Sequence, residues 1–263
     1  MTSQKPVDPV PAATMLLLRD KPEFQVLMVK RHHQIDFASG ALVFPGGKPA
    51  AGDDAEHWAD HCTGWDVLDP TQRALRIAAI REAYEEAGIL LADTNDGTAF
   101  EGSCDLASRK AVEHGERSFL DVVREADVRL RLHGLSDFAR WITPTFMNKR
   151  FDTWFYVARA PERQIAACDG YETVDAEWLS PAGALALGEA GERTIIFPYQ
   201  AEPGTAGAGK QRTGLHHPRR GAYDRPSPAA DRSARRKEFP DHSGKCRLRY
   251  SQRGGWLTRL HYP

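Results

Sequence analysis

The residues that decide the fold read Arg81-Glu82-Ala83-Tyr84-Glu85-Glu86-Ala87-Gly88-Ile89. In a helix with about 3.6 residues per turn, the three glutamates share one face and Arg81 lies beside them. The apolar side chains fall on the opposite side and predict a buried face, made of Ile77, Ile80, Tyr84 and Ala87. This stretch therefore predicts a helix with one acidic and one apolar face.

The sequence also predicts where this helix begins and ends. Asp69 is a suitable N-cap, Pro70 suits the first turn, and Gln72 occupies the third position. Gly88 is suited to end the helix, because glycine adopts the left-handed conformation at little cost. We expect the helix to begin next to Asp69 and to end before Gly88.

The acidic face has two interpretations. Glu82, Glu85 and Glu86 repel one another, by a few tenths of a kcal/mol for like charges one turn apart. A divalent cation offsets this repulsion, and clustered carboxylates suit a hard ion such as Mg²⁺ or Mn²⁺. The alternative is an ordinary solvated face of an amphipathic helix.

An upstream turn favours the metal interpretation. Phe44-Pro45-Gly46-Gly47-Lys48 ends an apolar strand, and its glycines allow the backbone to approach a ligand closely. A Gly-Gly turn followed by Arg-Glu-x-x-Glu-Glu-x-Gly-hydrophobic, here residues 81–89, resembles the signature of the Nudix hydrolases. The resemblance implies an α/β fold, the Nudix α/β/α sandwich with a mixed sheet. It also implies metal-dependent hydrolysis of nucleoside diphosphates linked to another group.

The first half of the signature departs from the family pattern. A long insert, residues 49–69, separates Gly47 from the helix, and Arg73 stands where the family has a glutamate. Asp53, Asp54 and Glu56 lie in the insert and are candidate replacements, although polar loop residues are the simpler interpretation. The insert, together with Arg31, Gly40 and the FPGG turn, resembles the coenzyme A diphosphatase branch of the family. Three polar positions of that branch's signature are not matched.

The resemblance implies a role for each candidate residue. Glu82, Glu85, Glu86 and the carbonyl near Gly47 would hold Mg²⁺ or Mn²⁺. Glu82 is the expected general base, and Arg81 would orient the carboxylates, so that Arg81, Glu82 and Glu85 form the catalytic set. The expected substrate-binding residues are Arg31, Gly40, Gly46 and Glu172. Glu177 is the alternative to Glu172 as a carboxylate from outside the signature, His32 and His33 accompany Arg31, and Arg150 and Asp152 are further candidates.

Apolar runs predict the rest of the sheet and its helices. Strands are expected at residues 12–18, 24–31, 41–44, 138–142, 150–157 and 172–179, with residues 89–92 returning into the sheet. Helices are expected at residues 118–130 and 181–189, the second capped by Ser180. The aromatic residues Phe151, Trp154 and Phe155 are expected in the core.

Composition bears on the cellular location of the chain and on membrane contact. The N-terminal residues lack the apolar core of a secretory signal, and no apolar run approaches the ~18 residues of a membrane span. The four cysteines are scattered and form no metal-binding or disulfide pattern. These features predict a cytoplasmic protein without membrane contact. The resemblance implies a small nucleotide-type substrate, and the oligomeric state is left open.

The charge distribution divides the chain. Residues 199–263 hold 14 of the 35 Lys and Arg residues but only 5 of the 36 Asp and Glu residues. We therefore expect a flexible arm at 1–11, a Nudix domain at 12–198 and a basic, poorly ordered tail at 199–263. One interpretation of the tail is a polyanion-binding arm, although nucleic acid is not the expected partner. The favoured one is translation in a shifted reading frame, because synonymous codons give family-like segments one frame away.

The expected reaction is hydrolysis of coenzyme A or acyl-coenzyme A to 3′,5′-ADP and (acyl-)4′-phosphopantetheine. Two alternatives remain open at this point. A related enzyme acting on NADH or ADP-ribose would keep the chemistry and change the cavity. A catalytically impaired Nudix module that only binds would follow from Arg73 and the altered tail.

Overall fold

The computed structural model describes residues 7–31, 40–170, 172–195, 248–250 and 257–259. The chain divides into two units, residues 1–198 and 199–263. In the second unit, β11 (Leu248–Tyr250) pairs with β12 (Leu257–Arg259) in an antiparallel hairpin. The rest of the expected basic tail lies outside the described residues, so its order and its reading frame stay predictions.

A seven-stranded mixed sheet forms the centre of the first unit. Its main order is β10-β2-β1-β9-β8, in which β1 and β9 are parallel and the other neighbours are antiparallel. The strands are β1 (Val10–Arg19), β2 (Gln25–Arg31), β8 (Ser136–Ile142), β9 (Phe151–Arg159) and β10 (Thr173–Leu179). Every strand expected in this sheet is present, except that residues 89–92 do not join it.

A fork between β1 and β2 holds the glycine turn. These strands pair only near their hairpin, at Leu18–Val26 and Arg19–Gln25. Beyond it they separate, and β3 (Leu42–Val43) pairs with β2 while β4 (Gly46–Gly47) pairs with β1. The sheet therefore fixes the backbone of the glycine turn on both sides.

Helix α1 (Pro70–Ala87) has the boundaries that the sequence predicts. The Asp69 side chain accepts a hydrogen bond from the Gln72 backbone N–H at 3.0 Å. Gly88 adopts a left-handed conformation with φ of 68°, and its N–H bonds to the Tyr84 carbonyl. The expected apolar face is confirmed as buried. The helix packs against β1, β4, β9 and β10.

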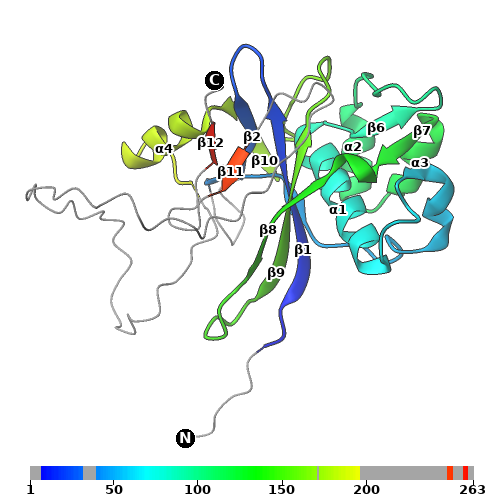
Figure 1. Ribbon diagram of the computed structural model, residues 1–263, viewed down its shortest axis with the longest axis horizontal. Helices are drawn as coiled ribbons and strands as arrows, with labels where there is room; N and C mark the ends of the chain where they lie inside the picture. The colour runs from blue at the N-terminus through cyan, green and yellow to red at the C-terminus, as the bar shows by residue number, and fades with distance from the viewer. Residues whose placement is uncertain (1–6, 32–39, 171, 196–247, 251–256, 260–263) are drawn as a thin grey trace, which may run out of the picture. The chain divides into compact units, whose positions relative to one another are not determined.

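The layers are those of an α/β/α sandwich. Figure 1 shows α1, α2 (Leu106–Glu113) and α3 (Phe119–Glu125) on one side of the main sheet and α4 (Pro181–Glu189) on the other. Ser180 caps α4 as expected, accepting from the Gly183 N–H. Among the described residues, no helix combines the length and the apolar character needed to cross a membrane.

A second, three-stranded sheet corrects two expectations. Residues 89–91 form a buried connection, and β6 (Ala92–Thr94) pairs with β7 (Val128–Arg131) rather than with the main sheet. The helix expected at 118–130 ends at Glu125, because Asp127 has a φ of 50° that an α-helix does not accommodate. The third strand is β5 (Cys62–Thr63), which follows the 3₁₀ helix η1 (Glu56–His61) of the insert.

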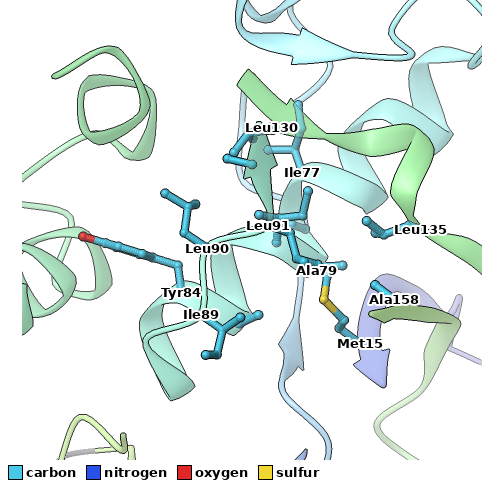
Figure 2. Close-up of a cluster of buried hydrophobic side chains, with 14 of the residues drawn as sticks. Met15, Ile77, Ala79, Tyr84, Ile89, Leu90, Leu91, Leu130, Leu135 and Ala158 are labelled. Atoms are coloured by element: carbon cyan, nitrogen blue, oxygen red, sulfur yellow. The ribbon is translucent and has the colours of Figure 1, made fainter. Parts of the chain in front are cut away.

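One apolar cluster joins the two sheets through α1. Figure 2 shows Met15 and Ala158 of the main sheet beside Ile77 and Ala79 of α1, with Leu130 from the smaller sheet. Residues 89–91 also lie in this cluster, so the connection after α1 adds to the core instead of extending the sheet. This packing holds α1 rigidly below the glycine turn.

Arg76 fastens the middle of α1 to the chain before β8. Its guanidinium donates to the carbonyl oxygens of Leu132, at 2.9 Å, and Leu135, and to Asp137 Oδ1 at 2.6 Å. It also lies over the Tyr156 ring, 5.0 Å from the centroid. A single side chain thus donates to the Leu132 carbonyl, in the 3₁₀ helix η2 (Leu132–Gly134), and to the carbonyl of Leu135, the residue that follows this helix.

We predict that Arg76→Met lowers the free energy of unfolding by about 2 kcal/mol or more. The substitution keeps the apolar stem but leaves buried carbonyls without donors, at about 1–3 kcal/mol each. Urea unfolding at constant pH measures the change. Arg163→Met, at an exposed position, is the matched control and should change stability by less than about 0.5 kcal/mol. Equal effects of the two substitutions would contradict this role for Arg76.

Candidate functional site

The acidic face of α1 is turned toward the glycine turn and not toward open solvent. Glu85 is 7% exposed and Glu86 is 4% exposed, and only about an eighth of the Glu82 side chain is accessible. The interpretation as a solvated face is therefore wrong. Burial of three carboxylates on one helix face is costly unless cations or donors compensate.

Arg81 is the cation that contacts Glu82 and Glu85. Its Nη1 lies 2.9 Å from Glu82 Oε1 and donates to both oxygens of Glu85, at 3.1 and 3.2 Å. Its Nη2 donates to the Lys48 carbonyl at 2.7 Å. Arg81 thus contacts two glutamate side chains and joins them to the chain after the glycine turn.

The two glycines bring backbone against the carboxylates. The Gly46 N–H donates to Glu86 Oε2 at 3.1 Å. A Cβ atom at Gly47 would lie 2.2 Å from Glu82 Oε1, so a side chain there would occupy the space of that carboxylate. A Cβ at Gly46 would lie 2.4 Å from the Ala13 carbonyl oxygen of β1. Glycine is needed at Gly46 because the backbone of β1 leaves no room, and a side chain at Gly47 would displace the Glu82 carboxylate.

The carboxylates of α1 hold protons more tightly than free glutamates do. Burial raises the pKa of Glu85 to about 7, although Arg81 opposes the increase. Burial, together with the charge of Glu82, raises the pKa of Glu86 well above its usual value. Burial also raises the pKa of Glu82, again against the effect of Arg81. For Arg81 itself, burial disfavours the charged form, but Glu82 and Glu85 outweigh it and raise the pKa.

The insert contributes a further carboxylate. Asp53 is 5% exposed, accepts a hydrogen bond from the Ala50 N–H at 2.7 Å, and is close enough to raise the pKa of Arg81. Burial raises the pKa of Asp53. Asp53 is therefore a buried loop residue that lines the cavity, whereas Asp54 and Glu56 are exposed.

Arg73, which stands where the signature has an acid, contacts the insert. Its Nε donates to the Trp65 carbonyl at 3.1 Å, and the guanidinium lies over the Trp65 ring at 4.3 Å. It also lies 3.8 Å from Glu56 Oε2. Arg73 therefore anchors the insert to α1, and the insert in turn places Asp53 at the site.

Glu172 reaches the site from the start of β10. Its N–H donates to Asp169 Oδ1 at 2.7 Å, and the neighbouring Thr173 hydroxyl donates to the Glu86 carbonyl at 2.9 Å. The charge of Glu172 contributes to the raised pKa values of Glu82 and Glu86. Of the two candidates from outside the signature, the structure places Glu172 here, while Glu177 pairs with Arg193 at 3.2 Å.

Of two residues expected to bind substrate, Arg31 lines the cavity and Gly40 does not. Arg31 ends β2, lines the cavity, and counteracts the raised pKa of Glu86. Gly40, with φ of 68°, donates its N–H to the Arg31 carbonyl at 3.2 Å and does not line the cavity. Its role is to turn the chain beside Arg31. His32 and His33 lie outside the described residues.

These groups surround a cavity of about 1050 Å³. Its walls come from β1, β4, β9, α1, the insert and the segment that joins α2 to α3. From β9, Phe151 and Thr153 face the cavity, with Lys149 just before them. Phe151 is thus a wall residue, not the core residue expected, while Phe155 is buried as predicted.

Two predicted residues are used elsewhere. Arg150 donates to the Thr143 carbonyl at 3.0 Å, and Asp152 forms a two-point ion pair with Arg140 at 2.6 and 2.7 Å. Alternation along β9 places them on the face away from Phe151 and Thr153. The sequence did not point to Glu113, the last residue of α2, or to Lys149 in the irregular segment before β9, although both line the cavity.

The donors do not converge on one point. Within the described part of the chain, no group of three His, Cys, Asp or Glu side chains is arranged to hold a metal ion as it stands. The reason is that Arg81 draws Glu82 and Glu85 to itself, while the Gly46 N–H holds Glu86.

Known proteins share this sequence and fold. The family model described as the NUDT19 Nudix domain matches residues 60–201, more than half of the chain. Acyl-coenzyme A diphosphatase NUDT19 of Homo sapiens is 29% identical over 204 residues, covering 61% of this chain and 54% of that protein. The Xenopus laevis protein of the same name is 24% identical over 206 residues, covering 62% and 54%. The chain spans about half the length of these curated relatives.

A solved structure supports the same assignment. The NUDIX hydrolase from Alicyclobacillus acidocaldarius superimposes with a TM-score of 0.63 at 25% identity, covering 73% of this chain and 88% of that one. Its similarity agrees with the mixed sheet, the glycine turn and the carboxylate helix described above. The resemblance in residues 81–89 is therefore confirmed, and the chain belongs to the Nudix hydrolase family, in the group of the NUDT19 Nudix domain.

Proposed function

We propose that this protein hydrolyses the diphosphate bond of coenzyme A or an acyl-coenzyme A, in a metal-dependent reaction. The products are 3′,5′-ADP and (acyl-)4′-phosphopantetheine. The observation that carries the proposal is the set of buried carboxylates on α1, which faces the Gly46–Gly47 turn and opens into a cavity of about 1050 Å³. Relatives named acyl-coenzyme A diphosphatase support the choice of substrate.

The residues present fit a divalent cation. Nudix hydrolases generally use such ions, and the donors here are carboxylate and carbonyl oxygens, which suit Mg²⁺ or Mn²⁺. Glu82, Glu85 and Glu86 would hold the ion, and the carbonyl near Gly47 is the further oxygen ligand that the family resemblance implies. Burial and mutual repulsion raise the pKa values of these groups, and a cation would offset both effects. When bound, it supplies charge neutralisation of the diphosphate and a more acidic water.

The protein's own residues complete the chemistry. Glu82, held between Arg81 and Gly47, is the proposed base that takes a proton from the attacking water. Oxygen from this water bonds to phosphorus while the bridging P–O bond breaks, which yields two phosphate products. Arg81 keeps Glu82 and Glu85 oriented and keeps a positive charge near the reacting phosphate.

The cavity offers polar groups for the nucleotide half of the substrate. Arg31 borders the carboxylates on the β2 side, and its Nε is buried without a hydrogen-bond partner among the described residues. Lys149 lies beside the Phe151 ring, 5.8 Å from its centroid, on the β9 side. A cation next to an aromatic ring suits a phosphate attached to a nucleoside, because the base can stack while the charges pair.

The alternative of a binding module without activity is less well supported. It rested on Arg73, which replaces an acid of the signature, and on the altered tail, most of which lies outside the described residues. Because Arg73 anchors the insert that brings Asp53 next to Arg81, the site retains a carboxylate in addition to those of α1. The same carboxylates would also suit the hydrolysis of NADH or ADP-ribose. Only a comparison of substrates separates this alternative from the proposed function.

We predict that Glu85→Gln lowers turnover by about 10²-fold or more while the protein stays folded, because the change removes a charged oxygen ligand. Steady-state rates at limiting Mg²⁺ measure the effect, with circular dichroism as the check on folding. Glu189→Gln on α4 is the control, since its side chain is exposed and distant in sequence from the site. Near-wild-type rates for the Glu85 variant would exclude the proposed metal site.

We also predict that coenzyme A or an acyl-coenzyme A is cleaved with a higher kcat/KM than NADH or ADP-ribose. The reason is that the insert and the α2–α3 segment extend the cavity beyond the carboxylates, which leaves room for a long substrate arm. Chromatography of the products from a matched panel decides the question, with release of 3′,5′-ADP as the expected result. Efficient cleavage of ADP-ribose alone would reject the proposed substrate.

A further inference from the structure

The cations that line the cavity differ in what they already contact. Arg81 pairs with two glutamates of α1, and Arg117 donates to Ser108 Oγ at 2.6 Å. Lys48 and Lys149 also line the cavity, and neither forms an ion pair with another residue that the structure describes. Lys48 directly follows the glycine turn, so its charge suits the reacting diphosphate. Lys149 precedes β9 and is left for a second anionic group.

The backbone around Lys149 is held in place by a buried side chain. Arg150 is 9% exposed, and its Nε donates to the Thr143 carbonyl at 3.0 Å. Its own carbonyl accepts from the Val10 N–H at 2.9 Å, and the next N–H, that of Phe151, donates to Thr143 Oγ1 at 3.0 Å. On the cavity side, Lys149 Nζ lies 5.8 Å from the centroid of the Phe151 ring. An ammonium group and an aromatic ring are thus presented together from a fixed segment.

The strand register measures how far this pair lies from the carboxylates. On β1, Ala13 is opposite Gly47, which lies against Glu82, and Val10 is opposite Phe151 of the neighbouring strand β9 (Figure 1). The three residues from Ala13 to Val10 correspond to about 10 Å along the strand, which is comparable to the length of a nucleotide from its 5′-phosphate to its base. A substrate with its diphosphate at Glu82 would therefore have its base near Phe151.

The floor between these two ends is made of short side chains. Ala12, Ala13 and Thr14 of β1 line the cavity, as does Thr153 of β9, which is opposite Ala12. Larger residues at these positions would fill the space between the glycine turn and the Phe151 ring. The floor therefore leaves room for a ribose between the diphosphate and the base.

Coenzyme A carries an additional charge at this ribose. Its adenosine has a 3′-phosphate as well as the 5′-diphosphate, whereas the adenosines of NADH and ADP-ribose have a free 3′-hydroxyl. We propose that Lys149 binds the 3′-phosphate of coenzyme A while the adenine stacks on Phe151, and that this ion pair makes the protein select coenzyme A over the same molecule without the 3′-phosphate. The inference rests on the proposed function and adds to it a residue that determines specificity.

A pair of substrates that differ only in this phosphate tests the proposal. The kcat/KM values for coenzyme A and 3′-dephospho-coenzyme A would be measured for the wild type, Lys149→Met, Lys48→Met and Lys21→Met. The wild type should prefer coenzyme A by about tenfold or more, the usual effect of a hydrogen bond to a charged group. In Lys149→Met this preference should disappear, through a higher KM for coenzyme A alone.

The other two lysines are the controls. Lys21 is exposed in the β1–β2 hairpin and does not line the cavity, so Lys21→Met should match the wild type. Lys48→Met should lower kcat/KM for both substrates by a similar factor, because both carry the diphosphate. Only a change at Lys149 should alter the ratio between the two substrates.

Binding of the nucleotide products gives a measurement that does not depend on turnover. Isothermal titration calorimetry at saturating Mg²⁺ would compare 3′,5′-ADP with 5′-AMP, which contain no diphosphate bond to cleave. The wild type and Lys149→Arg should bind 3′,5′-ADP more tightly than 5′-AMP, and Lys149→Met should bind them equally. Phe151→Leu should weaken both ligands by a similar factor, because it removes the stacking surface and keeps the cation.

The outcomes distinguish a failure of this inference from a failure of the proposed function. Equal kcat/KM values for the two substrates in the wild type, or a preference that survives in Lys149→Met, would overturn the role of Lys149 while the proposed function stands. If the wild type cleaves neither substrate, the proposed function fails. Calorimetry then still decides the inference, because equal binding of 3′,5′-ADP and 5′-AMP by the wild type would overturn it.

Discussion

Burial of like charges on one face of α1 is the constraint on which the rest of the structure depends. Two carboxylates about 5 Å apart in a surrounding of effective dielectric constant 20 repel by about 3 kcal/mol. Arg81 compensates Glu82 and Glu85, and the Gly46 N–H compensates Glu86. Burial raises the pKa values of all three carboxylates, and the charges of Arg81 and Arg31 with the Gly46 N–H offset it only in part. The fold therefore maintains a site whose incompletely compensated negative charge favours the binding of cations.

The rest of the chain holds this site together against that repulsion. The fork between β1 and β2 fixes the glycine turn above α1, and the core in Figure 2 fixes α1 from below. Arg109 and Thr173 bond to carbonyls at the C-terminal end of α1, which prevents this end from moving away from the cavity. The stability of the core thus compensates for an unfavourable local charge distribution, as is common at functional sites.

The sequence predicts the parts of the site that local rules govern. The period of α1, its Asp69 and Gly88 caps and the Gly46–Gly47 turn are local, and the structure has all of them. It does not predict that Asp53 is buried at the site, because the insert has no periodicity and is anchored by Arg73 of α1. Glu113 ends α2, and its position depends on the hydrogen bonds of Arg109 to α1. The helix expected at 118–130 was too long because an apolar run does not distinguish a helix from the strand β7 that follows it. The cytoplasmic location and the identity of the ion stay predictions.

The most direct test of this account is the effect of Mg²⁺ on thermal unfolding at pH 8 and pH 5. Glu85 has a folded-state pKa of about 7, above the unfolded value of about 4.5. Without metal, its contribution to stability therefore falls as the pH rises through this interval. Mg²⁺ should raise Tm clearly at pH 8, by an amount equivalent to about 2.7 kcal/mol at a hundredfold excess over Kd, and much less at pH 5. A Tm at pH 8 that does not respond to Mg²⁺ would contradict the account.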